Sequence, residues 1–570
     1  MFKKLFYFYF FLCFCGATAQ FQKYYDAGGH VYHDVNIEII ESSLGTGVIA
    51  AGNHFDPQMS AWVPFIQGMD ASGNVLWSVN GYAAGPTNLR LFDIEVYQDF
   101  LIMTGSVEDA NGLKKPVAAK YDLVTNSFAQ VYYYDVISTS FPAEAFNIKY
   151  TQADIDADGT PDPGFILGGY IIIPTGEKLG LVIRTDFDLQ PLAATEVGVS
   201  GANQSPGFNM VNKVTETNDG YFLTGSATYV NNNVAQQAVL MHKINFDLTM
   251  AWDISYVFSN QNDVSVDAYY DDSSNEIYAL VNYSSTHLFG VTVLENATGT
   301  IVGNKSWYAT NPNTEQYGFR IHKSPNSNNL IINGYDRISN IAASGTQMAE
   351  TNVVVYEFDK ATGQIAGSGY QYIIPNQELG TEDYNFWDNQ MPLIYYPEMA
   401  QYKDLVTGTN IAFKTGYYED PTTNVPDMAL FNNTGNANIC DNFSLTYTTN
   451  VFPNTLAVNA NSAGGLTVTP NAFSIALMPM SVTVTDCSSN AIDKQKIDEG
   501  LLYPNPVQNL LYIKFPNAQT YIIRDLSQRL VKTGRVENQT VPVSGLKKGI
   551  YVIEILYGDK HQKRITFIKK

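Results

Sequence analysis

The chain of 570 residues carries 33 Lys and Arg against 55 Asp and Glu, which gives a formal net charge of -22 at pH 7. A surface this acidic repels phosphate backbones, so nucleic acid is excluded as an expected partner. No segment is continuously apolar over the roughly 20 residues that a membrane-spanning helix needs, so we expect no transmembrane span.

Residues 1–19 have the features of a secretory signal peptide. Two lysines precede an apolar run from Leu5 to Cys15, and the small residues Ala17 and Ala19 suit cleavage by signal peptidase. The apolar run is about half as long as a bilayer span. We therefore predict that this segment directs export and is removed, leaving a mature N-terminus near Gln20.

The stretch 20–439 repeats one strand pattern. In most copies of the repeat, an aliphatic strand is followed by a turn with an acidic residue or Asn, and then by an aromatic-rich strand. A further strand precedes each copy. The repeat is longer than one hairpin and shorter than the about 100 residues of a two-sheet sandwich. Each unit is marked by an apolar segment that ends in a small or polar residue; these segments are 47–53, 99–106, 163–170, 219–226, 276–283, 328–335 and 411–418.

Four antiparallel strands repeated about seven times predict an all-β fold, a seven-bladed β-propeller. The alternative is a string of two-sheet sandwiches. Asp219 to Gly225 and Asp70 to Trp77 resemble a strand and a turn found in secreted multi-blade propellers. That resemblance implies the fold only.

An acidic loop interrupts the third repeat, with the sequence ADIDADGTPD at 153–162. Carboxylates at alternate places around a tight turn at Gly159 direct oxygen ligands at one centre, which suits Ca²⁺. The alternative is a solvated acidic turn. The expected ligands are the side chains of Asp154, Asp156, Asp158 and Asp162 and the carbonyl of Thr160.

This loop resembles the first nine places of an EF-hand loop and the calcium loops of integrin-type propellers, dockerins and thrombospondin repeats. It departs from the EF-hand at the twelfth place, where Phe165 stands instead of a bidentate Glu. The resemblance therefore implies a structural calcium site of an extracellular protein, with no part in catalysis.

The sequence offers no motif for catalysis or for binding an organic cofactor, because it contains no H-E-x-x-H, G-x-S-x-G or P-loop pattern. We therefore assign no catalytic residue. Trp62, Trp307 and Trp387 could stack on sugars, although aromatic residues of propellers are more often core.

Two cysteines remain once the signal peptide is removed, Cys440 and Cys487. An even pair in an exported chain is most simply one disulfide, and the alternative is two separate buried thiols. The stretch 440–490 alternates Thr and Val in short runs, so we expect a small β element closed by that disulfide. A charged linker over 491–498 follows.

The stretch 499–570 is predicted to be a separate all-β module. It contains Tyr503-Pro504-Asn505-Pro506, a strand at Leu510 to Ile513, Gly549-Ile550-Tyr551 and a terminal Lys569-Lys570. In the order and spacing of these residues it resembles the type A sorting domain of type IX secretion substrates, a β-sandwich. The resemblance implies passage through the outer membrane by the type IX machinery, followed by surface attachment or release.

We therefore expect a secreted or cell-surface β-propeller that acts as a binding or adhesion protein, with an extracellular glycan or protein as its ligand. The alternative is a glycan-active hydrolase or lyase with its site in the propeller funnel. A structural surface-layer component is a third possibility.

Overall fold

The computed structural model describes residues 21–372, 399–486 and 502–570, with short gaps inside these ranges and with side chains in part of them only. Every element in the described residues is a β-strand. None of these residues forms a helix long and apolar enough to cross a membrane. The chain divides into two compact units, Met1–Val484 and Thr485–Lys570. The prediction of an all-β protein is confirmed.

The described part of the first unit contains seven antiparallel sheets, here called blades 1 to 7, and each has four strands of a repeat. Blade 1 contains β2 (Val31–Ser42), β3 (Gly45–Asp56), β4 (Ala61–Asp70) and β5 (Val75–Ala84). Blade 2 contains β6 (Thr87–Tyr97), β7 (Phe100–Glu108), β8 (Lys114–Asp122) and β9 (Ser127–Val136). Blade 3 contains β10 (Ala143–Thr151), β11 (Gly164–Ile172), β12 (Lys178–Asp186) and β13 (Pro191–Val197).

The remaining blades follow the same plan. Blade 4 contains β14 (Met210–Glu216), β15 (Tyr221–Asn231), β16 (Val234–Ile244) and β17 (Met250–Val257). Blade 5 contains β18 (Val264–Asp271), β19 (Glu276–Tyr283), β20 (Leu288–Glu295) and β21 (Trp307–Thr310). Blade 6 contains β22 (Glu315–Lys323), β23 (Leu330–Ile341), β24 (Gln347–Asp359) and β26 (Gly369–Tyr372), and the short β25 (Gln364–Ile365) pairs with β24. Blade 7 contains β27 (Met399–Lys403), β28 (Asn410–Glu419), β29 (Pro426–Asn432) and β1 (Phe21–Asp26).

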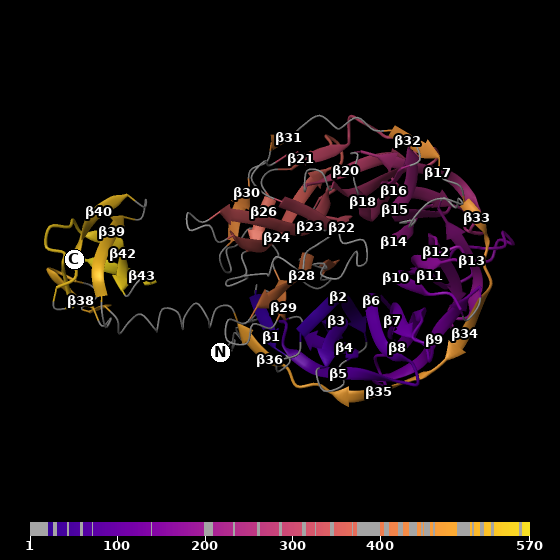
Figure 1. Ribbon diagram of the computed structural model, residues 1–570, viewed down its shortest axis with the longest axis horizontal. Coiled ribbons are helices and arrows are strands. Elements are labelled where there is room, and N and C mark those ends of the chain that lie inside the picture. The colour runs from indigo at the N-terminus through magenta and orange to yellow at the C-terminus, as the bar shows by residue number, and fades with distance from the viewer. Residues whose placement is uncertain are drawn as a thin grey trace, which may run out of the picture. The chain divides into compact units, whose positions relative to one another are not determined.

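The blades stand around a common axis with the first strand of each innermost, which is the β-propeller arrangement (Figure 1). Neighbouring first strands contact one another from β2 through β6, β10, β14 and β18 to β22, and β2 also contacts β27. The second strand of every blade contains one of the apolar segments from which the propeller was predicted. Buried side chains fill the space between blades; one such core joins Ile102 of blade 2 to Leu167 and Leu181 of blade 3.

The segment after blade 7 does not form the small β element predicted for 440–490. Its strands pair in chain order with blades 6, 5, 4, 3, 2, 1 and 7, so the segment, here called the belt, runs around the outside of the ring (Figure 1). The prediction was wrong because the outer edge of each blade offers unpaired backbone groups, to which a short strand can add. The belt strands are β30 (Asn442–Leu445), β31 (Thr448–Thr449), β32 (Leu456–Asn459), β33 (Ser462–Gly465), β34 (Val468–Ala472), β35 (Ser474–Pro479) and β36 (Thr483–Asp486).

Alternation along the belt separates an inner from an outer face. Leu466 and Val468 pack against the core between blades 2 and 3, and Ile475 and Leu477 pack against the core between blades 1 and 2. The residues between them, such as Ala476, are exposed. The period of two in the sequence therefore reflects packing on the blades rather than a separate core.

Blade 7 combines the two ends of the propeller unit. Its fourth strand is β1 from the N-terminal end of the described chain, which pairs with β29 on one side and with β36 of the belt on the other. The last repeat of the sequence is short because this strand comes from elsewhere in the chain.

The second unit consists of two sheets with a shared apolar core, including Ile523, Ile553 and Phe567. One sheet contains β37 (Leu502–Tyr503), β38 (Leu510–Ile513) and β41 (Thr540–Pro542). The other contains β40 (Leu530–Arg535), β39 (Ala518–Asp525), β42 (Gly549–Tyr557) and β43 (His561–Lys569). This is the β-sandwich that the sequence predicts.

Candidate functional site

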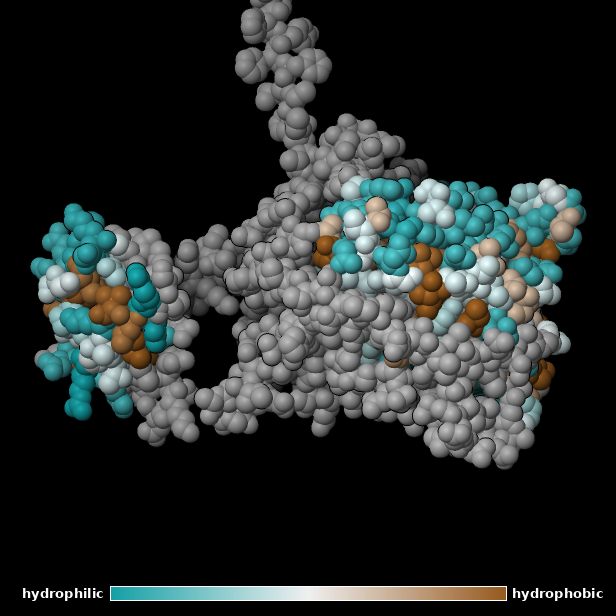
Figure 2. Space-filling view, turned by 90° about the horizontal axis from the view of Figure 1, so that it is seen from above, coloured by the Kyte–Doolittle hydropathy of each residue, from teal (hydrophilic) through white to brown (hydrophobic). Residues whose placement is uncertain are grey.

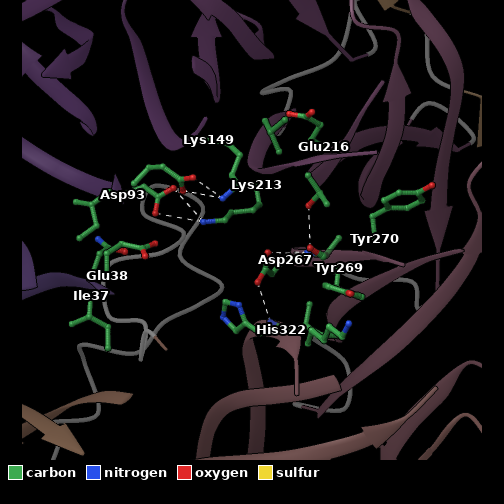
Figure 3. Close-up of a pocket in the computed structure, with 18 residues that line it drawn as sticks. Ile37, Glu38, Asp93, Lys149, Lys213, Glu216, Asp267, Tyr269, Tyr270 and His322 are labelled. Carbon is green, nitrogen blue, oxygen red and sulfur yellow. Dashed lines mark hydrogen bonds and ion pairs between the residues drawn. The ribbon is translucent and has the colours of Figure 1, made fainter. Parts of the chain in front are cut away.

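A cavity of about 530 Å³ lies among the innermost strands of the ring. Its walls come from the first strands of six successive blades, β2, β6, β10, β14, β18 and β22 (Figure 3). Ligand sites in proteins are typically concave, with volumes of about 300 to 1,000 Å³. The cavity is therefore the candidate ligand site among the described residues.

Three consecutive positions of each first strand lie at the level of the cavity, and most of them line it together with the following residues Glu216, Tyr270 and Lys323. In all six strands the pairing with the second strand shifts register, and the residue that follows the shift takes the first position. The first positions are Asn36, Asp93, Asn147, Lys213, Asp267 and Arg320. The second positions are Ile37, Ile94, Ile148, Val214, Ala268 and Ile321. The third positions are Glu38, Glu95, Lys149, Thr215, Tyr269 and His322.

Alternation along the strands gives these positions different roles. The second positions are aliphatic and buried, and Ile94, Val214 and Ile321 belong to three different cores between the blades. All six third positions line the cavity. Successive side chains of a strand point to opposite sides, so a buried aliphatic residue in the middle turns its neighbour toward the central space.

The first positions join each blade to the next. Asp93 accepts a hydrogen bond from the backbone N–H of Ile148 at 3.0 Å, and Asn147 accepts one from that of Val214 at 2.8 Å. In the same way, the carboxylate of Asp267 accepts from the N–H of Ile321 at 3.0 Å. Each of these acceptors satisfies a backbone donor at the second position of the following blade.

Both lysines that face Asp93 and Glu95 are neutralised within the wall. The ammonium group of Lys149 donates to the two carboxylate oxygens of Glu95 at 2.7 and 3.0 Å, and that of Lys213 lies 3.2 Å from Asp93. Burial alone would lower the pKa of Lys149, but the attraction of Glu95 raises it above its usual value. Lys149 is therefore charged at neutral pH, and both lysines have a carboxylate partner in the wall.

The third positions of blades 4 to 6 carry no charged side chain, although Lys213, Glu216, Asp267 and Lys323 of the same strands also line the cavity. The hydroxyl of Thr215 donates to the carbonyl of Ala268 at 3.0 Å, and half-buried Tyr269 packs against the core between blades 5 and 6. Burial, reinforced by the positive charge of Arg320, lowers the pKa of His322 to about 3, so its imidazole is neutral at pH 7. Its Nε2 atom is buried and has no hydrogen-bond partner in the described part of the chain.

Two other acids of the wall are shifted toward the protonated form. Burial raises the pKa of Asp267, against the opposing effect of Arg320, and burial also raises the pKa of Glu216. The carboxylate of Asp267 nevertheless accepts from two backbone donors, the N–H groups of Ala268 and Ile321. Its role in the wall is therefore structural.

The acidic loop between β10 and β11 brings three of its predicted ligands together. Oxygens of Asp154, Asp156 and Asp162 lie within 4.8 Å of one another, and Asp158 is outside this group. One carboxylate oxygen of Asp154 accepts from the N–H of Gly159 at 2.7 Å, while the other is buried and has no hydrogen-bond partner among the described residues. The backbone N–H of Thr160 donates to Asp158 at 2.7 Å.

The base of this loop is fixed to blade 3. The guanidinium of Arg184, a side chain that is fully buried, donates to the backbone carbonyl of Asp162. Ala157 and Gly159 have positive φ angles of 58° and 87°, which closes the turn. The loop thus leaves one buried carboxylate oxygen of Asp154 without a hydrogen-bond partner among the described residues, and the predicted calcium ion stays a prediction.

The structure describes two of the three tryptophans proposed for sugar contact. Trp307 is 1% exposed and belongs to the core between blades 5 and 6, so it is not a surface platform. Trp62 is half-buried, with the guanidinium of Arg90 at 4.9 Å from its ring centre. Trp387 lies outside the described residues.

Other sequence predictions also lie outside the described residues: the signal peptide, the linker 491–498, and the disulfide between Cys440 and Cys487.

The cavity residues were not found from the sequence. Their signal is visible once the first strands are aligned on the register shift, as Asn-Ile-Glu, Asp-Ile-Glu, Asn-Ile-Lys, Lys-Val-Thr, Asp-Ala-Tyr and Arg-Ile-His. The middle residue is always aliphatic, whereas the third changes from blade to blade. The register shift that defines the alignment is a property of strand pairing, which the sequence does not display.

Comparison with known families identifies the C-terminal module. Residues 501–570 match the family described as the secretion system C-terminal sorting domain. The chain carries a type IX sorting domain. Such a domain marks proteins that are secreted or attached at the cell surface, and it implies contact with the type IX secretion machinery. A search of curated proteins found no match to the chain.

Among solved structures, the chain is similar to extracellular domains of B. thetaiotaomicron sensor proteins. One, described as a one component system, is 8% identical, with a TM-score of 0.20 over 97% of this chain and 99% of that chain. Another, described as a hybrid two component system, is 8% identical, with a TM-score of 0.19 over the same shares. A third, also a hybrid two component system, is 10% identical, with a TM-score of 0.14 over 94% and 97%. Scores this low support no argument about a ligand.

Proposed function

We propose that this protein is a secreted or cell-surface binding protein whose ligand enters the central cavity. The proposal rests on the different roles of successive positions along the first strands, which line the cavity shown in Figure 3. First positions such as Asp93 and Asn147 bind the neighbouring blade and second positions fill the cores, so the third positions, with Glu216, Tyr270 and Lys323 beside them, are left to vary. A wall whose scaffold repeats while its facing side chains change from blade to blade is suited to recognising one asymmetric ligand.

The alternative, a glycan hydrolase, needs two carboxyl groups that are free to act on the substrate. In the described wall, Asp93 and Glu95 are paired with lysines, and Asp267 accepts from two backbone N–H groups. Two further carboxyl groups line the described wall: Glu216, whose pKa burial raises, and Glu38, which interacts electrostatically with Lys149. We favour binding over hydrolysis because most of these carboxyl groups already have a partner in the wall. Release of reducing ends from a panel of polysaccharides would support the enzyme instead.

The binding proposal is tested by filling the cavity. Thr215→Trp places a large side chain in the wall, and Thr469→Trp makes the same change at an exposed belt position as a control. The full-length protein is screened by thermal shift against neutral sugars, sugar acids, amino sugars and amino acids. We expect at least one class to raise Tm saturably in the wild type and in Thr469→Trp but not in Thr215→Trp. Equal shifts in all three proteins would contradict a site in the cavity.

We also propose that the loop at 153–162 binds a structural Ca²⁺. Three clustered carboxylates and the buried, unpartnered oxygen of Asp154 support this ion, because burying an anionic oxygen without a partner is costly. The ion would fix the loop to blade 3 beside Arg184.

Calcium is titrated into chelator-treated full-length protein while Tm is followed. The expected result is a saturable rise in the wild type that is lost in Asp154→Asn, since only a ligand of the folded state stabilises it. Asp247→Asn, in an exposed turn of blade 4, serves as the matched control. A rise that persists in Asp154→Asn places the ion elsewhere.

A further inference from the structure

The third positions of the cavity wall form two groups of different chemistry, here called the charged half and the uncharged half, although Lys213, Glu216, Asp267 and Lys323 of blades 4 to 6 line the cavity as well. The third positions from blades 1 to 3 carry charged side chains, Glu38, Glu95 and Lys149. Those from blades 4 to 6 carry groups that are uncharged at pH 7, Thr215, Tyr269 and His322. Figure 3 shows Glu38 and Asp93 on one side of the cavity and Tyr269 and Tyr270 on the other.

Most charged side chains of the charged half are already paired with one another. Lys149 is bound to both oxygens of Glu95, and Lys213 to Asp93, while Asp93 also accepts from the backbone of the next blade. An ionic ligand would have to compete with these pairs inside a cavity where water screens little, and it would leave one partner uncompensated. The pairs therefore act against a ligand that binds through its own charge.

The uncharged half has open hydrogen-bonding capacity beside an aromatic ring. Nε2 of His322 is buried and unpartnered in the described part of the chain, and leaving such an atom without a hydrogen bond destabilises the free protein until a ligand satisfies it. Tyr269, on the neighbouring first strand, is half-buried and also lines the cavity. The hydroxyl of Thr215 from blade 4 already donates to the carbonyl of Ala268, so its oxygen can accept a hydrogen bond from a ligand. Together these groups suit a ligand that has an apolar face and several hydroxyl groups.

We infer that the cavity binds a neutral sugar, with Thr215, Tyr269 and His322 forming the contact wall. This inference rests on the proposed function, because it names the ligand class for the same cavity. In the bound state a sugar hydroxyl bonds Nε2 of His322, and a C–H face of the ring packs on Tyr269. The ion pairs of the charged half stay closed and exclude charged analogues.

The test is calorimetric titration of the full-length protein with neutral mono- and disaccharides, glucuronic acid and glucosamine. We expect at least one neutral sugar to bind saturably and more tightly than either charged probe. His322→Phe removes the nitrogen but keeps an aromatic ring, and should weaken binding at least tenfold. His322→Gln keeps a hydrogen-bonding group and should restore part of the affinity. Thr215→Val should weaken binding, and the same change at the exposed belt residue Thr469 should not.

The outcomes separate the ligand class from the site. If only glucuronic acid or glucosamine binds, and the His322 and Thr215 variants abolish that binding, the cavity is the ligand site but the inference of a neutral sugar is wrong. If a neutral sugar binds equally well to wild type, His322→Phe and Thr215→Val, the sugar site lies elsewhere and both proposals fail. The absence of any neutral sugar binding at millimolar concentration also overturns the inference. Circular dichroism of each variant identifies loss of folding.

Discussion

The inner wall of the ring consists of the first strand of each blade, whereas the belt adds a further strand to the outer edge of each blade, and the two are held in place differently. On the inner wall polar side chains bind the backbone of the next blade, as Asp93 does, or face the cavity. In the belt, apolar residues such as Ile475 face inward and small residues such as Ala476 face outward (Figure 2 shows part of the outer surface). The same secondary structure is therefore specified by polar contacts at the centre and by apolar packing at the rim.

The largest loss of stability is expected when a buried charge of the inner wall is removed. Asp93→Ala removes the partner of Lys213 and the acceptor of two donors, the Ile148 N–H and the side-chain amide of Asn147, so three polar groups lose a partner at once. We expect a loss of about 2 to 4 kcal/mol in the free energy of unfolding, measured with urea. Asp247→Ala, an exposed turn acid, is the control. A loss below that of the control would mean that the inner ring does not depend on this contact.

In the belt, a substitution is expected to destabilise the protein through lost apolar packing instead. Ile475→Asp places a carboxylate where an aliphatic side chain meets the core between blades 1 and 2. The expected loss is about 2 to 3 kcal/mol, from the lost burial and the cost of the charge. Ala476→Asp, one residue further along and exposed, should change stability by less than about 0.5 kcal/mol. Equal urea midpoints for the two variants would show that the belt is not packed on the blades.

Acid is expected to weaken the blades through a buried histidine far from the belt. His242 is fully buried, and burial lowers its pKa to about 4, below the unfolded value of about 6.5. The unfolded chain therefore binds a proton between these values that the folded chain does not, so stability is full above pH 6.5 and falls as the pH drops toward 4. This group costs about 2 kcal/mol at pH 5.

Comparison of urea unfolding at pH 7 and pH 5 checks this contribution. In His242→Gln the difference between the two pH values should shrink by about that amount, whatever the variant does to stability at pH 7. An unchanged difference would assign the acid sensitivity to other groups.

The smallest effect on stability is expected at a third position of the inner wall. Thr215→Val loses one hydroxyl that donates to the Ala268 carbonyl and keeps the shape of the side chain. We expect a change within about 1 kcal/mol, measured by thermal unfolding. A larger loss would place Thr215 with the first positions, as part of the scaffold rather than of the ligand wall.

The sequence predicts those parts of the fold that depend on neighbouring residues. The second strands are apolar runs closed by turn residues, and the loop at Asp154 groups its carboxylates within one tight turn. The partners of the belt strands could not be predicted, because a period of two fixes the faces of a strand but not the edge to which it adds. The same limit applies to β1, whose partners β29 and β36 come from the other end of the unit.

The residues of the cavity wall could not be predicted from the sequence for a related reason. Glu38, Lys149 and His322 are far apart in the chain, and only the register shift in each blade brings them to one level. By contrast, the type IX sorting domain was identified from its own short motifs, because they are local in the sequence.

The central claim is that the third positions face a ligand, and cysteine labelling tests it most directly. A Thr215→Cys variant of the full-length protein is alkylated with and without a saturating neutral sugar, and the rate is measured by mass spectrometry of the peptide. Thr469→Cys in the belt serves as the reference. The account predicts that the sugar slows alkylation in the cavity several-fold and leaves the belt cysteine unchanged. If a sugar that binds leaves both rates unchanged, the cavity is not its site.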